Sequence, residues 1–350
     1  MKHQVNRLSA AFLVLLSLTA LDSFAQAQKL PPALAGTIPA RPSGRIAFVR
    51  DGDVWIMDAD GTSQMRVCEV KNADGRLSWA PDGKRIVFSR SSVIDWKEPD
   101  NSGGRKKLYD LFVCFLDSAA KSNTLYWHRI TEALGGRDPE WSADGSTILF
   151  TRIMNADAIR TDFPNYQICT IDPDGGSFQV LRKDWQSATE YLLAPSISPT
   201  GDIACEHLYS TMTPGKPESK SYKRQGFAVL PRANFMKSLD TVRAMSTHFA
   251  DCLSPSWSPD GQWLAFVRND MNKSGVYIID KGLKSTYLVY EPPVGASVLT
   301  VAPSWSPDSK WLTFSTDDGS VYICQITGAG VKRLSGPGSD RFPAWSKSAK

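Results

Sequence analysis

The chain has 350 residues, 42% of them hydrophobic, which is enough for a substantial core in two ordinary domains or one large all-β domain. A formal net charge of +4 is too mild to argue for a nucleic acid partner. Beyond the first residues, no apolar stretch approaches the length of a membrane span.

The chain begins with what we interpret as a signal peptide of 25 residues. Lys2 and Arg7 precede the apolar run Leu8–Leu21, whose 14 residues would form a helix of about 21 Å, against a bilayer core of about 30 Å. Small residues allow cleavage after Ala25 or, equally well, after Ala27. We therefore expect export to the periplasm, and a mature chain that has lost two basic residues and one acidic residue.

A repeated motif, Pro-x-Trp-Ser-x-Asp-Gly followed by an alternating apolar strand, organises the rest of the chain. Its copies are Leu77–Gly83, Pro139–Gly145, Pro195–Gly201, Pro255–Gly261, Pro303–Ser309 and Pro343–Ser346. The third copy has Ile197 in place of the tryptophan. Proline and glycine around the aspartate favour a tight turn, so each copy predicts a β-hairpin.

A second pattern, a strand that ends in a polar turn, follows each hairpin. Asp53–Asp58 before Asp60 and Gly61 is an example, and a further β-prone segment comes after most copies, so the unit is four antiparallel strands. The repeats open with the second-strand sequence Arg45–Val49 and close on the first-strand sequence at Trp345. Joining these two strands in one blade would close a ring and remove a free sheet edge. We predict an all-β, six-bladed β-propeller over residues 44–350, preceded by a linker at 26–43.

These motifs resemble the TolB-type propeller repeat, called PD40 after its Pro-Asp turn, over about residues 44–350. Peptidases, lyases and pure binding proteins share this repeat, so the resemblance implies the fold more strongly than the function. TolB carries an α/β domain before its propeller, whereas only residues 26–43 are available here, so contact with TolA is not implied. In TolB the partner Pal docks over the channel opening, which implies a site for a Pal-like envelope protein or peptide.

Three consecutive units carry long insertions between their second and third strands, at Ser91–Lys107, Ile153–Asn165 and Leu208–Arg224. In such a propeller these insertions would lie on one face, opposite the Pro-Asp-Gly turns. They could be tolerated decoration, or they could form a rim for a partner. In the second interpretation Trp96, unless it lies under its own loop, is an anchor. The cations that would steer an acidic partner are Lys216, Lys220, Lys223 and Arg224.

Residues just before each first strand should surround the mouth of the central channel. They are Arg76, Arg137, Asp138, Glu190, Asp251, Asp340 and Arg341. A ring of mixed charge suits an inserted peptide, although it could also be a solvated ring of turn residues paired with one another. The repeated tryptophans are expected to pack between blades instead.

Catalytic motifs are missing from the sequence: there is no nucleophile elbow, zinc-protease helix, phosphate loop or dinucleotide fingerprint. We therefore predict a non-catalytic, monomeric module for protein interaction, without a cofactor. One alternative is a divalent metal at His207 and His248, aided by Glu190 or Asp251, which resembles lyases of uronic-acid oligosaccharides. Passive carbohydrate binding and hydrolysis by paired carboxylates also stay open. The six cysteines show no metal spacing and are expected to be buried thiols.

Overall fold

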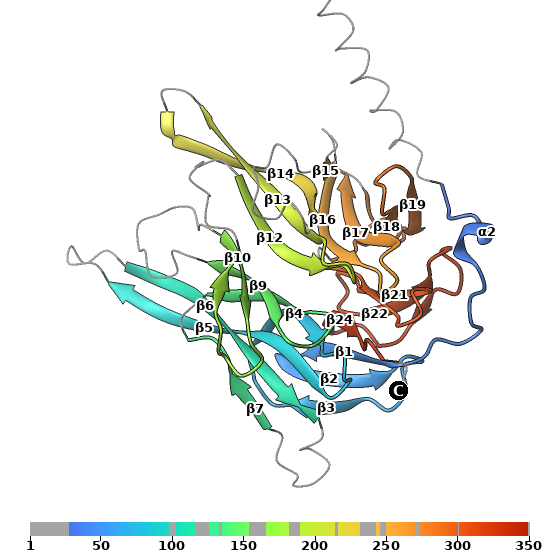
Figure 1. Ribbon diagram of the computed structural model, residues 1–350, viewed down its shortest axis with the longest axis horizontal. Coiled ribbons are helices and arrows are strands. Elements are labelled where there is room, and N and C mark those ends of the chain that lie inside the picture. The colour runs from blue at the N-terminus through green and yellow to red at the C-terminus, as the bar shows by residue number, and fades with distance from the viewer. Residues whose placement is uncertain are drawn as a thin grey trace, which may run out of the picture.

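The structure, a computed structural model, describes residues 28–97, 103–116, 126–132, 135–153, 166–181, 190–213, 216–231, 243–245, 250–270, 273–299 and 301–348. These residues form six four-stranded antiparallel sheets arranged as a ring, together with one short helix (Figure 1). The predicted six-bladed β-propeller is therefore confirmed. The predicted signal peptide lies outside the described residues.

Blades are numbered here in chain order, starting with the sheet that holds the first strand. Blade 1 contains β24 (Arg341–Trp345), β1 (Arg45–Arg50), β2 (Asp53–Asp58) and β3 (Met65–Cys68). Blade 2 contains β4 (Ala73–Trp79), β5 (Arg85–Lys97), β6 (Gly103–Phe115) and β7 (Tyr126–Arg129). Blade 3 contains β8 (Gly136–Trp141), β9 (Ile148–Ile153), β10 (Tyr166–Ile171) and β11 (Gln179–Val180).

The remaining three blades follow the same order from the centre outward. Blade 4 contains β12 (Glu190–Ile197), β13 (Ile203–Thr213), β14 (Lys216–Leu230) and β15 (Arg243–Met245). Blade 5 contains β16 (Ala250–Trp257), β17 (Trp263–Asp270), β18 (Lys273–Asp280) and β19 (Thr286–Tyr290). Blade 6 contains β20 (Ser304–Trp305), β21 (Trp311–Ser315), β22 (Val321–Gln325) and β23 (Lys332–Arg333).

Blade 1 joins the two ends of the ring, as the sequence predicted. β24 pairs antiparallel with β1, with Ile46 opposite Trp345 and Ala47 opposite Ala344. The indole of Trp345 also donates to the carbonyl of Ser43 at 2.8 Å. Because β24 supplies the first strand of the blade, the ring closes without leaving the inner edge of β1 unpaired.

The Trp-Ser-x-Asp-Gly motif forms its turn through hydrogen bonds between its own side chains. In three blades the serine hydroxyl donates to the turn aspartate, at 2.6 Å for Ser142, 2.6 Å for Ser258 and 2.5 Å for Ser306. The backbone N–H two residues after the aspartate donates to the same carboxylate. The side chains therefore satisfy polar groups that the tight turn would otherwise leave to water.

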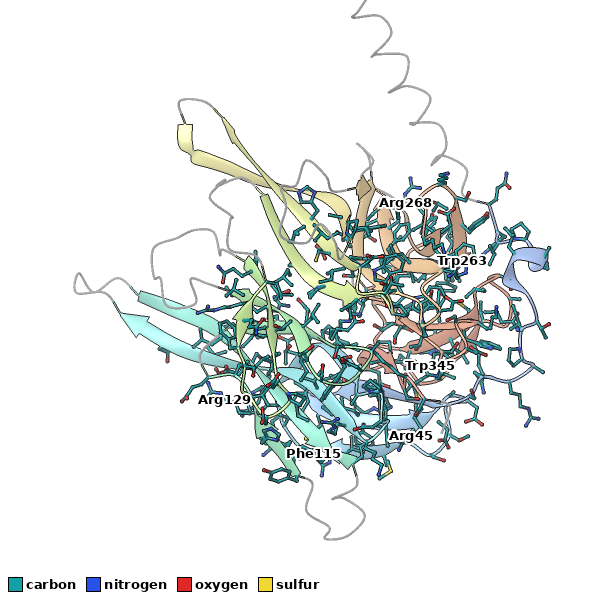
Figure 2. All side chains as sticks on the ribbon, viewed as in Figure 1. Arg45, Phe115, Arg129, Trp263, Arg268 and Trp345 are labelled. Atoms are coloured by element: carbon teal, nitrogen blue, oxygen red, sulfur yellow. The ribbon has the colours of Figure 1, made fainter. Side chains whose placement is uncertain are left out.

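Among the described residues the hydrophobic core is divided into six clusters, one between each pair of neighbouring blades. The repeated tryptophans lie in these clusters, so their predicted role in packing between blades is confirmed. Figure 2 shows side chains crowded between the sheets, with Phe115 and Arg129 on the outer strands of blade 2. All six cysteines are buried thiols, as predicted.

The segment expected to be a linker packs against blades 5 and 6. Leu30 and Ala35 belong to the cluster between these blades, and α2 (Pro32–Ala35) is the helix of this segment. Lys29 donates to the carbonyl of Val289 at 2.7 Å, and Lys310 donates to the carbonyl of Ala35 at 2.6 Å. No helix among the described residues is long and apolar enough to cross a membrane.

Two of the three predicted insertions are continuations of strands. β5 and β6 stay paired from Arg85 and Phe115 out to Lys97 and Gly103, and β13 and β14 stay paired to Thr213 and Lys216. Both hairpins project beyond the ring in Figure 1. The other insertion falls on 154–165, outside the described residues. We call the end of the ring that carries these hairpins the insertion face, and the opposite end the turn face.

Candidate functional site

The first strands of blades 1 to 5 each contain a β-bulge, which the sequence did not predict. The pairing register shifts just before the repeated tryptophan position in blades 1 to 5. Four residues directly before a proline adopt positive φ there: Asp138 at 50°, Ala194 at 50°, Ser254 at 53° and Phe342 at 56°. A bulge turns the strand locally, so these residues are redirected towards the channel.

These redirected residues line a cavity of about 240 Å³ at the insertion face, which we call the mouth cavity. Asp138, Ala194, Ser254 and Phe342 contribute to its wall, and Arg76 and Arg137 bring positive charge. The guanidinium of Arg137 lies over the ring of Tyr109, 4.5 Å from the ring centre. The mouth cavity therefore combines apolar surface with charges of both signs.

The predicted mouth residues divide into two groups. Arg76, Arg137 and Asp138 lie together around the mouth cavity. Asp340 is buried and forms two 2.7 Å bonds with Arg50, one to each carboxylate oxygen, so its charge helps to hold blade 1 together. Arg341 is exposed at the start of β24.

For the other predicted binding residues the structure describes the backbone alone. Glu190 and Asp251 lie at the beginnings of β12 and β16, the strands that line the channel in blades 4 and 5. Trp96 lies near the tip of the β5–β6 hairpin, and the remaining predicted cations lie in β14. These cations are Lys216, Lys220, Lys223 and Arg224.

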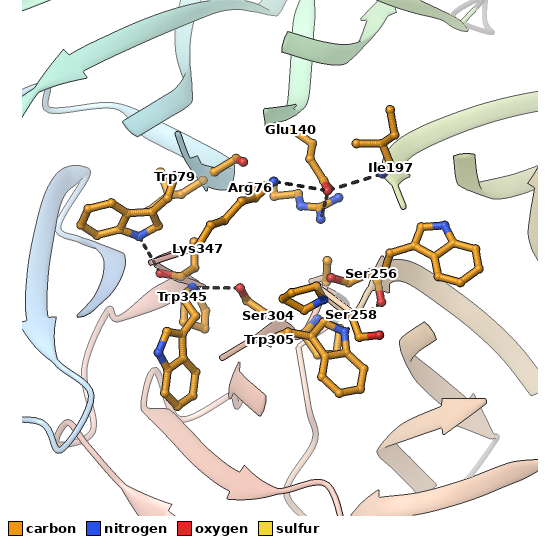
Figure 3. A pocket seen from close by; sticks show the side chains of 18 of the residues that line it. Arg76, Trp79, Glu140, Ile197, Ser256, Ser258, Ser304, Trp305, Trp345 and Lys347 are labelled. Atoms are coloured by element: carbon orange, nitrogen blue, oxygen red, sulfur yellow. Dashed lines mark hydrogen bonds and ion pairs between the residues drawn. The ribbon is translucent and has the colours of Figure 1, made fainter. Parts of the chain in front are cut away.

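A second cavity, of about 250 Å³, occupies the channel towards the turn face, and we call it the channel cavity (Figure 3). Four of the repeated tryptophans line it, Trp79, Trp257, Trp305 and Trp345, as do prolines from the turns and first strands. Serines of several first strands add hydroxyl groups. Arg76 lines both cavities, so it lies at their boundary.

Three charged side chains converge on one side of the channel cavity (Figure 3). Nη2 of Arg76 lies 2.5 Å from Oε2 of Glu140, and Nζ of Lys347 lies 4.0 Å from Oε1. The glutamate also accepts 3.4 Å hydrogen bonds from Ser196 and from the backbone of Ile197. Side-chain exposure is 13% for Arg76, 8% for Glu140 and 32% for Lys347, so this charge cluster is largely enclosed.

Enclosure changes the protonation chemistry of the lysine. Burial lowers the pKa of Lys347, the negative charge of Glu140 raises it, and the positive charge of Arg76 lowers it further. The Lys347 side chain as a whole is 32% exposed. Lys347 also donates a 2.9 Å hydrogen bond to the carbonyl of Trp141.

Our sequence analysis missed Glu140 and Lys347 as site residues. A signal for Glu140 was present, because the residue before the repeated tryptophan position is serine or alanine in every other copy of the motif. Those copies have Ser78, Ser196, Ser256, Ser304 and Ala344. Lys347 carried no such signal, since it follows the last copy of the motif and becomes a site residue only when the ring closes.

The metal alternative rests on two histidines, one of which the structure describes. His207 is buried in β13, and His248 lies outside the described residues. Among the described residues, no group of three or more His, Cys, Asp or Glu side chains could hold a metal ion.

The ring of blades around these cavities defines the chain as a closed β-propeller with a central channel. A model of the WD domain, G-beta repeat, matches residues 288–324. The uncharacterized peptidase YuxL of Bacillus subtilis (strain 168) is 25% identical over 207 residues. That alignment covers 55% of this chain, which spans only 29% of the length of this relative.

Two solved structures share the architecture. TolB from Acinetobacter baumannii has a TM-score of 0.61 and 20% identity, with 88% of this chain and 68% of that chain covered. A putative TolB from Agrobacterium tumefaciens has a TM-score of 0.55 and 13% identity, with 89% and 93% covered. The chain therefore has the six-bladed β-propeller fold that these TolB structures share.

Proposed function

We propose that this propeller is a periplasmic, non-catalytic binding module that holds a protein or peptide partner over the mouth cavity. Support comes from the gathering of Arg76, Arg137 and Asp138 around one cavity at the insertion face. Charges of both signs within an apolar wall suit a polar segment of a partner chain, because complementary charges fix register and speed encounter. A Pal-like envelope protein is the type of partner we expect.

The extended hairpins add a second reason to place the partner on this face. They rise beside the mouth: the ammonium of Lys107, at the base of the β5–β6 hairpin, forms an ion pair with Asp74 at the start of β4. A partner that contacts both the hairpins and the mouth would bury far more surface than a cavity of about 240 Å³ offers. Stable interfaces bury about 1,200–2,000 Å² in total.

Photocrosslinking from one residue on each face tests this proposal. A benzoylphenylalanine at exposed Arg341, on the insertion face, should crosslink a protein in envelope extract, whereas the same residue at exposed Gln262, on the turn face, should not. Excess unlabelled protein should compete for the crosslink. Capture from the turn face alone, or turnover of an oligosaccharide by the purified protein, would overturn the proposal.

A further inference from the structure

We propose that the channel cavity is a binding site for an organic carboxylate that carries an apolar substituent. This site adjoins the mouth cavity, with which it shares Arg76, and its occupation does not require the partner described above. Arg76 and Lys347 would contact the carboxylate, and the tryptophans and prolines would contact the apolar part.

The charge of the cluster favours an anion. Arg76 and Lys347 bring two positive charges to the cavity and Glu140 brings one negative charge, which leaves the enclosed cluster with a net charge of +1. Such charge imbalance is costly when it is enclosed, and a bound carboxylate would neutralise it. A cationic ligand would have to pair with Glu140, the one carboxylate of the cluster, and Arg76 and Lys347 already lie beside it.

Both cations have hydrogen-bonding capacity beyond their contacts within the protein. Arg76 uses Nη1 for the carbonyl of Pro195, at 2.9 Å, and Nη2 for Glu140, out of five N–H donors. Lys347 uses one of its three donors for the carbonyl of Trp141. Because these contacts also restrain the side chains, the donors are held ready for a ligand.

The rest of the wall selects for an apolar substituent of limited size. Trp305, Ile197 and Pro259 are among the residues around the cavity, and the hydroxyl groups of Ser256 and Ser258 lie across the channel from the charge cluster (Figure 3). The volume of about 250 Å³ falls just below the roughly 300–1,000 Å³ of drug-sized sites. It therefore suits a small acid or the last one or two residues of a peptide.

Calorimetry with N-acetyl-leucine and its amide as probes tests the carboxylate requirement. The acid should bind in a saturable manner at millimolar concentration, and the amide should bind at least about tenfold more weakly, because it cannot form the charge-assisted bonds. Acetyl-Ala-Ala-Leu acid distinguishes the two kinds of ligand, a free small acid and the C-terminal end of a peptide. If it binds more tightly than acetyl-leucine, the ligand is a peptide end; if it binds more weakly, the ligand is a free small acid. No saturable binding, or equal binding of acid and amide, would overturn the proposal.

Two variants with opposite expected effects locate the site. Lys347→Met should weaken acetyl-leucine about tenfold, because one charged donor is lost. Glu140→Gln should strengthen it about tenfold, because a negative charge beside the ligand is removed while a hydrogen-bond acceptor stays for Arg76. Lys310→Met is the matched control, since Lys310 also donates to a backbone carbonyl but lies outside the cavity. Unchanged affinity in Lys347→Met, or weaker binding in a folded Glu140→Gln variant, would contradict the assignment.

Failure of this proposal is distinguishable from failure of the proposed function. The probes and variants act on the turn-face side of the channel, whereas the crosslinking experiment reports contact at the insertion face. A protein that loses acetyl-leucine binding in Lys347→Met should still crosslink its partner from position 341.

Discussion

Asp144 shows how much a single turn residue can depend on its ionised form. Its carboxylate accepts from the Ser142 hydroxyl at 2.6 Å, from the Ser146 N–H at 3.0 Å and from the Ser146 hydroxyl at 2.8 Å. Hydrogen bonds from Ser142 and then Ser146 lower the pKa of Asp144 from 3.8 to about 2. The folded state therefore binds this proton less readily than the unfolded state does, which links folding to pH.

Replacing Asp144 with asparagine should change the acid sensitivity of the protein. The stabilisation from a lowered pKa is fully present above the unfolded value of 3.8 and is lost as pH falls through about 2. We expect Asp144→Asn to lower stability at pH 7 by about 1 kcal/mol at most, because the side chain is exposed. Its stability should then fall less steeply than that of the wild type between pH 4 and pH 2. Urea unfolding midpoints across this range measure the difference, and parallel curves would refute the linkage.

The first strand of each blade illustrates how one repeated residue can serve the same packing role with different polar contacts. Trp79 and Trp141 occupy equivalent positions, both are fully buried, and an arginine lies over each ring, Arg45 at 5.0 Å and Arg85 at 4.6 Å. The indole N–H of Trp79 donates to the carbonyl of Ala344 in blade 1 at 2.9 Å. The indole nitrogen of Trp141 has no hydrogen-bond partner among the residues that the structure describes.

Phenylalanine at each of these two positions separates the hydrogen bond from the packing. Both variants lose similar volume, but only Trp79→Phe breaks a hydrogen bond between blades. We expect Trp79→Phe to be less stable than Trp141→Phe by about 1–2 kcal/mol. Urea denaturation of the two variants measures this difference. Equal losses would mean that the indole N–H contributes nothing to the joint between blades.

The elements also show where prediction from sequence stops. The hairpins could be predicted, because Pro-Asp-Gly turns and alternating apolar residues are signals that span only a few residues. The bulges at Asp138 and Phe342 could not be predicted. The positive φ of these residues is imposed by the neighbouring strands and does not follow from the preference of an aspartate or a phenylalanine. The long insertions were expected to be loops, yet the β5–β6 and β13–β14 ladders continue through them. Polar strands of this kind lack the alternating pattern from which a strand is recognised.

At the scale of the whole molecule, the order of repeats predicted ring closure but not the contents of the channel. Complementary strands at Arg45 and Trp345 were enough to infer that blade 1 is shared. The cluster of Arg76, Glu140 and Lys347 unites residues from three separate parts of the chain, and no local spacing relates them. The sequence placed Asp340 at the channel mouth. Ring closure instead brings Asp340 next to Arg50, and the ion pair between them holds the aspartate within blade 1.

Ring closure itself can be tested by removing β24. Deleting residues 341–350 would expose the inner edge of β1 and take Trp345, which is 2% exposed, from the cluster between blades 6 and 1. Loss of a buried tryptophan alone costs about 3–5 kcal/mol, against a usual total stability of about 5–15 kcal/mol. We expect the truncated protein to unfold at much lower temperature and to self-associate through the free edge.

A complementation experiment separates a lost strand from a general effect of truncation. A synthetic peptide spanning Asp340–Ser348 should raise the melting temperature of the truncated protein in a concentration-dependent manner, because binding of the missing strand stabilises the folded ring. The same peptide with alanine in place of Trp345 should fail, since this side chain fills the cluster with Trp311 and Leu334. Removal of residues 349–350 alone should leave the melting temperature unchanged. A truncated protein that melts like the full chain would show that β24 is dispensable, and that the blades hold their circle without the joint between the first and last strands.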